Sequence, residues 1–195
     1  AYLLVDEVYI GAELGLSETK SFLGMYEKTI VTSGLSKSYS NPGLRIGWII
    51  SDKSFVEEAW ALKDYTTIAS SSLSQHIAAK VLEPETILKL RSRTKDLLNK
   101  NLETFCDWIL PYSNHLSFFN PEAGGFVFVE YDMDINSTDL IHDLRTKEGV
   151  FIVPGDSFGM DKYFRIGLGH EPIGFKKGLE LLSKGLTRIF PHIFA

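Results

Sequence analysis

The stretch SGLSKSYSNPGLRIGW (residues 33–48) combines a lysine, a Pro-Gly turn and an arginine, and it decides how the rest of the chain is interpreted. Lys37 follows small and apolar residues, and Arg45 stands eight positions later, where an apolar run begins. Apolar, β-branched runs typical of buried strands lie on both sides, at residues 28–34 and 44–50. The pattern indicates chemistry that uses a loop lysine together with an arginine.

Composition describes a globular protein and excludes several classes of function. The 195 residues are 44% hydrophobic and 23% charged, which is enough apolar material to bury a core. A net charge of −5 with no basic block argues against a nucleic-acid binder, and no apolar run approaches the length of a membrane span. The start shows no basic segment typical of a signal peptide. The single Cys106 excludes an internal disulfide and fits a reducing compartment, so we expect a cytoplasmic protein.

Strand-like and helical segments alternate along the chain, which predicts an α/β protein. We expect strands at residues 2–5, 28–34 and 44–50, then helices at residues 53–62 and 70–83. A long helix at residues 85–110 exceeds the average length and suggests a connector between two lobes. The remaining sequence predicts strands in HLSFF, GGFVFVEY, VFIVPG and YFRIGLG, and a closing helix at residues 171–190. It also predicts a helix in STDLIHDLRTKEG (residues 137–149), with Ser137 or Thr138 as its cap and Gly149 as its stop. The expected domains are residues 1–82, a connecting helix at 83–110, and a smaller α+β domain at 111–195.

Three familiar motifs fail to explain Lys37. A P-loop needs glycine immediately before the lysine, where this chain has Ser36. A Ser-x-x-Lys acylase needs serine at position 34, which is glycine, and a nucleophile elbow needs glycine two residues after Ser36, where Ser38 stands. The remaining interpretation is a lysine that forms a Schiff base with an aldehyde cofactor.

Pyridoxal phosphate needs an amine, a carboxylate for its ring nitrogen, and cationic or hydroxyl groups for its phosphate. Asp6 ends the first predicted strand, Lys37 follows the second, and Arg45 begins the third. If these three strand ends share one rim of the sheet, the residues meet where α/β sheets bind ligands.

With DEVY (residues 6–9) upstream, the lysine stretch resembles the class I/II aminotransferases of pyridoxal-phosphate fold type I. Their pattern of a small residue, any residue, a small residue and lysine, with arginine eight positions on, is met by Gly34, Ser36, Lys37 and Arg45. The resemblance implies a large α/β/α sandwich that binds pyridoxal 5′-phosphate, followed by a small α+β domain. It extends over all 195 residues and covers the C-terminal half of the family, or somewhat more, so we expect the N-terminal half to be missing.

The resemblance also implies a role for each matching residue. Lys37 forms the Schiff base and shuttles the substrate proton, and Asp6 binds the pyridine nitrogen. Tyr9 donates to the phenolic oxygen of the cofactor, while Ser36 and Arg45 hold its phosphate.

Arg165 matches the arginine that clasps the substrate α-carboxylate, since an arginine in YFRIGLG is otherwise an unpaired charge in a strand. Two departures affect the phosphate cup. Gly34 replaces a frequent serine, so one hydrogen bond is lost or supplied by Ser33, and Asn41 replaces a usual apolar residue.

The expected function is transfer of an amino group between an amino acid and a 2-oxo acid. The residues do not separate this reaction from β-elimination or cyclisation on the same fold. A non-catalytic ligand-sensing domain of a regulator and an inactive remnant also remain open. Relatives are homodimers, and residues 66–75 are our candidate for a segment that reaches the neighbouring subunit. The five histidines show no ligand spacing, so we expect no metal.

Overall fold

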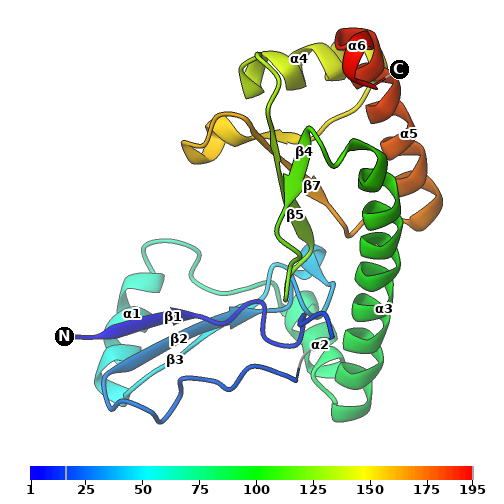
Figure 1. The fold of residues 1–195 in the computed structure, drawn as a ribbon. Helices are drawn as coiled ribbons and strands as arrows, with labels where there is room; N and C mark the ends of the chain where they lie inside the picture. The colour runs from blue at the N-terminus through cyan, green and yellow to red at the C-terminus, as the bar shows by residue number, and fades with distance from the viewer. Residues whose placement is uncertain (16, 195) are drawn as a thin grey trace. The chain divides into compact units, whose positions relative to one another are not determined.

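The computed structural model describes residues 1–15 and 17–194, with Phe194 described by its backbone alone. The chain divides into two compact units. Unit 1 comprises residues 1–95 and 122–124, and unit 2 comprises residues 96–121 and 125–195. Helices accompany a separate sheet in each unit, which confirms the predicted α/β class (Figure 1). Among the described residues, no helix has the length and apolar character that crossing a membrane requires.

Unit 1 is built on a three-stranded sheet in the order β1–β2–β3. Strands β1 (Leu3–Asp6) and β2 (Thr29–Gly34) are parallel, with Asp6 opposite Thr32. Strand β3 (Gly47–Ile50) runs antiparallel to β2, with Gly34 opposite Gly47. The ends of β1 and β2 and the beginning of β3 therefore lie on the same edge of the sheet.

Three helices complete unit 1, and their starts follow from capping residues. The Asp52 carboxylate accepts from the Phe55 amide at 3.0 Å and begins α1 (Lys53–Lys63). Ser71 caps α2 (Ser72–Val81), and Pro84 opens α3 (Pro84–Ile109), whose first half belongs to this unit. A core cluster joins the loop after β2 to α2 and α3 through Leu35, Tyr39, Ala78 and Val81, with Ile87 and Leu90 packed against them.

Unit 2 has a four-stranded antiparallel sheet in the order β4–β5–β7–β6. Its strands are β4 (Leu116–Phe118), β5 (Phe126–Tyr131), β6 (Val153–Pro154) and β7 (Tyr163–Gly167). Along β5 and β7, buried Val127, Val129, Phe164 and Ile166 alternate with more exposed neighbours. One face of the sheet is therefore covered, while the other carries Arg165.

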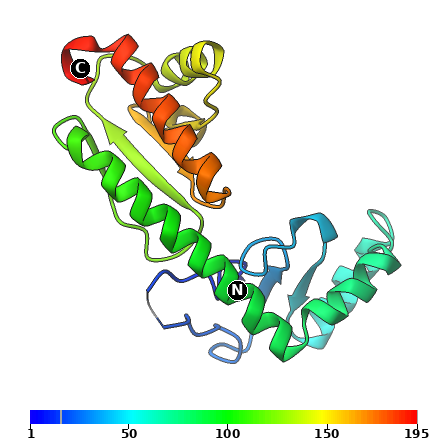
Figure 2. The ribbon, with the colours of Figure 1, turned by 90° about the vertical axis from the view of Figure 1, so that its right-hand side faces the viewer.

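The covered face packs against the second half of α3 and against α5 (Pro172–Ile189), as Figures 1 and 2 show. Both helices present buried residues at helical spacing, namely Leu98, Leu102, Phe105 and Ile109 on α3, and Phe175, Leu179, Leu182 and Leu186 on α5. The Trp108 indole donates to Ser183 at 2.7 Å, and the Asn101 amide donates to the Leu168 carbonyl at 2.7 Å. These bonds fix α3 against α5 and against the end of β7.

Several element ends differ from the sequence prediction, and one helix was not predicted. The predicted third strand (residues 44–50) begins only at Gly47, because Pro42–Leu44 form one turn of 3₁₀ helix. Strand β6 is reduced to two residues, since a second 3₁₀ turn (Gly155–Phe158) follows it. Helix α4 (Ser137–Glu148) is capped by Asn136 and ends at Gly149 in the left-handed region. A short α6 (Pro191–Phe194) was not predicted.

Candidate active site

Four of the predicted site residues line one cavity at the edge of the three-stranded sheet. Asp6, Ser36, Lys37 and Arg45 surround a space of about 390 Å³. The strand directions explain the meeting, because two parallel strands end where the antiparallel third strand begins. The edge predicted from three strand ends is therefore present, although Arg45 precedes β3 rather than lying in it.

Lys37 is exposed on the loop between β2 and the 3₁₀ turn. Within residues 1–15 and 17–194, its amine forms neither a hydrogen bond nor an ion pair, and Nζ lies 5.9 Å from the centre of the Tyr9 ring. The Ser40 amide donates to the Lys37 carbonyl at 2.8 Å, so the backbone is held while the amine is free. A free amine on a fixed backbone is what an incoming carbonyl group requires.

Arg45 and Ser36 supply donors on the same cavity wall. Arg45 adopts the left-handed conformation (φ 55°), and its Nη1 donates to the Pro42 carbonyl at 3.0 Å, which leaves further guanidinium donors for an anion. The Ser33 hydroxyl, considered from sequence as a replacement phosphate donor, donates instead to the Glu7 carbonyl at 3.3 Å. Ser36 is therefore the better-placed hydroxyl.

Asp6 and Tyr9 begin the loop that follows β1. One Asp6 carboxylate oxygen accepts from the Val8 amide at 3.2 Å, and the other has no recorded hydrogen bond among the described residues. Tyr9 does not line the cavity of Lys37, but lines an adjoining cavity of about 230 Å³ that also contains Asp6. Asp6 therefore stands between the two cavities.

A buried carboxylate stabilises the loop after β1. The Glu13 side chain, only 7% exposed, accepts from the Gly11 and Thr19 amides, both at 2.9 Å. Burial alone raises the pKa of this carboxyl, but these amide hydrogen bonds outweigh it and hold the pKa below its usual range. The loop thus depends on an ionised Glu13.

Arg165 lies in unit 2, on the face of the sheet opposite the helices. Its guanidinium carbon is 5.2 Å from the ring centre of Phe126 and 5.0 Å from that of Phe158. The strand pairing sets Phe128 beside it. Within the part of the chain that the structure describes, no carboxylate forms an ion pair with Arg165. The two rings stabilise this unpaired cation.

The turn that presents Phe158 has little room for change. At Gly155, an added methyl group would overlap the Met160 and Tyr163 carbonyl oxygens. The turn ends at Gly159, with φ 70°. This rigid turn sets Phe158 against the guanidinium of Arg165.

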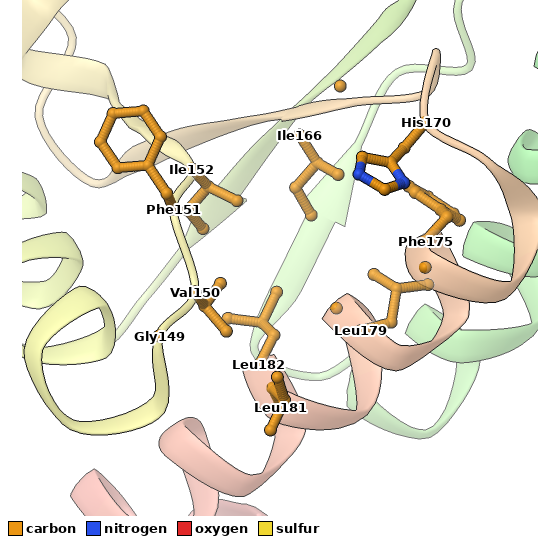
Figure 3. A pocket seen from close by; sticks show the side chains of 13 residues that line it. Gly149, Val150, Phe151, Ile152, Ile166, His170, Phe175, Leu179, Leu181 and Leu182 are labelled. Carbon is orange, nitrogen blue, oxygen red and sulfur yellow. The ribbon is translucent and has the colours of Figure 1, made fainter.

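A third cavity in unit 2 contains none of the predicted catalytic residues. It measures about 210 Å³ and lies between residues 149–152, β7 and α5 (Figure 3). Its lining is mainly aliphatic and aromatic, and Phe151 and His170 lie on opposite sides of it (Figure 3). His170 is occupied by its own turn, where Nδ1 lies 3.3 Å from the Glu171 carbonyl. No cluster of three or more metal-ligating side chains occurs among the described residues.

The sequence did not predict which side chains surround Arg165 or which residue supports the loops of the candidate site. Phe126 and Phe158 stand in GGFVFVEY and VPGDSF, both ahead of the arginine strand, and their aromatic character was the available signal. Arg91, which contacts Glu18 and Tyr39, carried no local signal because its partners are 73 and 52 positions away in the chain.

The chain is similar to several known proteins. The family model described as "Aminotransferase class I and II" matches residues 1–181. Capreomycidine synthase of Streptomyces vinaceus is 30% identical over 152 residues, covering 78% of this chain and 39% of the relative. The (5-formylfuran-3-yl)methyl phosphate transaminase of Methanocaldococcus jannaschii is 27% identical over 194 residues, covering 96% and 50%.

A solved structure shows the same fold. The PLP-dependent aminotransferase from Streptococcus suis superimposes with a TM-score of 0.88 at 32% identity, covering 96% of this chain and 49% of that one. The chain therefore spans about half the length of this structure, and two fifths to half the length of the two relatives above.

Proposed function

The chain belongs to the aminotransferase class I and II family, whose members use pyridoxal 5′-phosphate, and from this premise we propose that the protein transfers an amino group between an amino acid and a 2-oxo acid. The observation that carries the proposal is the single cavity shared by Asp6, Ser36, Lys37 and Arg45. It offers a free amine, a carboxylate, a hydroxyl and a guanidinium, which are the groups that this cofactor needs. The residues present therefore fit the cofactor.

Each residue has a role that its chemistry allows. The bound cofactor supplies an aldehyde and an electron-withdrawing ring that stabilises negative charge at the substrate Cα. Asp6 accepts a charge-assisted hydrogen bond from the ring nitrogen, while Ser36 and Arg45 donate to the phosphate. Lys37 would hold the cofactor through its amine and, once the substrate amino group has taken its place, the freed amine would move the proton at the substrate Cα. Tyr9, beside the amine, donates a hydrogen bond from its hydroxyl to the cofactor phenolic oxygen.

Arg165 recognises the substrate in this proposal. Its planar fork donates two parallel hydrogen bonds to an α-carboxylate, and the rings of Phe126 and Phe158 limit competition from water. Every amino acid and every 2-oxo acid carries this carboxylate, so Arg165 serves both halves of the reaction.

Labelling of the lysine tests the proposal. The protein is incubated with pyridoxal phosphate, reduced with borohydride and mapped by peptide mass spectrometry. We expect the pyridoxyl group on Lys37 and its loss in Lys37→Ala; a label on Lys20 or Lys28 instead would contradict the site. Transfer of ¹⁵N from an amino acid to a 2-oxo acid then tests the reaction.

Three other outcomes are distinguishable in the same experiments. Labelling of Lys37 with release of a 2-oxo acid but no transfer of ¹⁵N would indicate elimination, and a ring-closed product would indicate cyclisation. Labelling without turnover of any amino acid would favour a ligand-sensing domain.

A homodimer and a cytoplasmic location are part of the same proposal. Large apolar side chains of unit 1 are exposed, among them Trp60 (66%), Tyr65 (89%) and Ile68 (67%). We take these exposed apolar side chains as part of the surface that a partner subunit covers. Light scattering of the holoenzyme tests the dimer, and a monomeric mass would contradict it.

A further inference from the structure

The loop that carries Lys37 is attached to α3 at two points. Arg91 Nη2 donates to the Tyr39 hydroxyl at 3.1 Å, and the guanidinium carbon lies 5.0 Å from the centre of the Tyr39 ring. The hydroxyls of Ser40 and Thr94 are 2.7 Å apart. Since Thr94 already donates its proton to the Leu90 carbonyl, Ser40 is the donor. Both attachments lie within three residues of Lys37.

Tyr39 and Thr94 are buried, with 8% and 7% of their surface exposed. The Ser40 amide donates to the Lys37 carbonyl, which links the attached residues directly to the lysine backbone. Ser40 itself has φ 52°, a conformation that a non-glycine residue adopts only when its surroundings hold it. The contacts with α3 supply that restraint.

The same arginine also holds the loop after β1. Arg91 Nη1 donates to the Glu18 carboxylate at 2.6 Å. Its Nε packs against Gly11, where an added methyl group would lie 2.5 Å away. Gly11 therefore leaves the space that the arginine occupies, and its φ of +88° also suits glycine. Asp6 and Tyr9 belong to the beginning of this loop.

Arg91 is thus shared by the two loops whose residues form the site. It lines neither the cavity of Lys37 nor the adjoining cavity of Tyr9. Its Nε is buried without a hydrogen-bond partner among the described residues, so the side chain is not fully satisfied where it stands. An unsatisfied buried donor is costly, and a purely stabilising role accounts poorly for it.

We propose that Arg91 is a positioning residue, which sets the place of the Lys37 amine relative to Asp6 and Tyr9 by tying both loops to α3. The inference rests on the proposed function, because it takes Lys37 as the reacting amine. The recorded result of this positioning is the 5.9 Å between Lys37 Nζ and the Tyr9 ring centre. A small displacement of a reacting group is enough to slow a reaction strongly.

Arg91→Met tests the role of the guanidinium, and Arg93→Met is the matched control. Arg93 is exposed on the same helix and, among the described residues, forms no hydrogen bond or ion pair. In the holoenzyme we expect Arg91→Met to lower kcat by roughly tenfold or more, while KM for the amino acid changes less than about threefold. Borohydride trapping on Lys37 should slow, and the visible circular dichroism of the bound cofactor should change. Arg93→Met should resemble the wild type in all four measurements.

Two further variants separate positioning from stability. Arg91→Lys keeps the charge opposite Glu18 but cannot also donate to Tyr39, so we expect it to recover only part of kcat. Tyr39→Phe removes the hydroxyl that accepts from Arg91 and leaves the ring packed. It replaces Arg91→Met as the test of positioning if that variant does not fold. Its effect should not add fully to that of Arg91→Met, because both variants remove the same Arg91–Tyr39 hydrogen bond.

The inference is overturned if Arg91→Met and Tyr39→Phe lower only the melting temperature and leave kcat, trapping and dichroism within about twofold of the wild type. Failure of the proposed function looks different. In that case the wild type itself carries no label on Lys37.

Discussion

Replacement of Arg165 by methionine separates recognition of the carboxylate from chemistry at the lysine. Methionine keeps an unbranched chain between the rings of Phe126 and Phe158 but removes every donor. Truncating one partner of a desolvated charge pair costs about 2–5 kcal/mol. Because Arg165 is only half-buried, we expect the lower end, near 2 kcal/mol, which corresponds to a loss of roughly thirtyfold in kcat/KM.

The assay measures kcat/KM of the holoenzyme for aliphatic, aromatic and acidic amino acids. A carboxylate common to all substrates predicts a similar loss for each class. Arg145→Met is the control, since Arg145 is exposed on α4 and forms no hydrogen bond or ion pair with any residue that the structure describes. The absorption spectrum of the bound cofactor should stay unchanged. A loss confined to one class of side chain would refute the reasoning and assign Arg165 to side-chain recognition.

Three further predictions concern chemistry, pH and backbone. Asp6→Asn should retain the cofactor but lower turnover by roughly a hundredfold or more, because an amide stabilises a protonated ring nitrogen poorly; near-normal kcat would remove Asp6 from the site. The depressed pKa of Glu13 contributes stability that is present above its unfolded pKa and lost as pH falls through the folded value. Urea unfolding from pH 6 to pH 3 should therefore show a steeper loss of stability in the wild type than in Glu13→Gln, and parallel curves would contradict this. Gly155→Ala should lower the free energy of unfolding by more than about 2 kcal/mol, because the added methyl group overlaps backbone atoms. Gly178→Ala, at an open position in a helix, should instead raise the free energy of unfolding by roughly 0.5–1 kcal/mol. Equal effects of the two substitutions would show that the turn at Gly155 can shift.

Elements with strong local signals could be predicted from the sequence. The β-branched run before Gly34 gave β2, and Pro84 with the helical spacing after it gave α3 to within a residue. Boundaries failed where a turn competed with an apolar pattern. Residues 44–46 look like the start of a strand, but Pro42 and Gly43 favour a tight turn that absorbs Leu44 and leaves Arg45 left-handed.

The candidate site likewise has residues that the sequence could group in advance and contacts that it could not predict. Asp6, Ser36, Lys37 and Arg45 could be grouped in advance, because each lies at the end of a strand and strand ends meet at a rim. The contacts of Arg91 depend on packing between a helix and two loops, and no spacing in the sequence encodes them. The contacts of Arg165 with Phe126 and Phe158 could not be predicted, because they depend on the register of β5 and β7 and on the fold of the turn after β6.

The glycine pair that closes the lysine loop has a consequence for how this protein can vary. Gly34 and Gly47 face each other in the sheet, and a methyl group on Gly34 would lie 2.9 Å from the Ile46 carbonyl. The tip between them, at Pro42 and Gly43, is exposed. This tip is nevertheless an ordered turn, because the Pro42 carbonyl accepts from both the backbone amide and the guanidinium of Arg45. An insertion there would move Arg45 relative to Lys37, so we expect divergence to spare both the glycine pair at the base and the eight-residue spacing between Lys37 and Arg45.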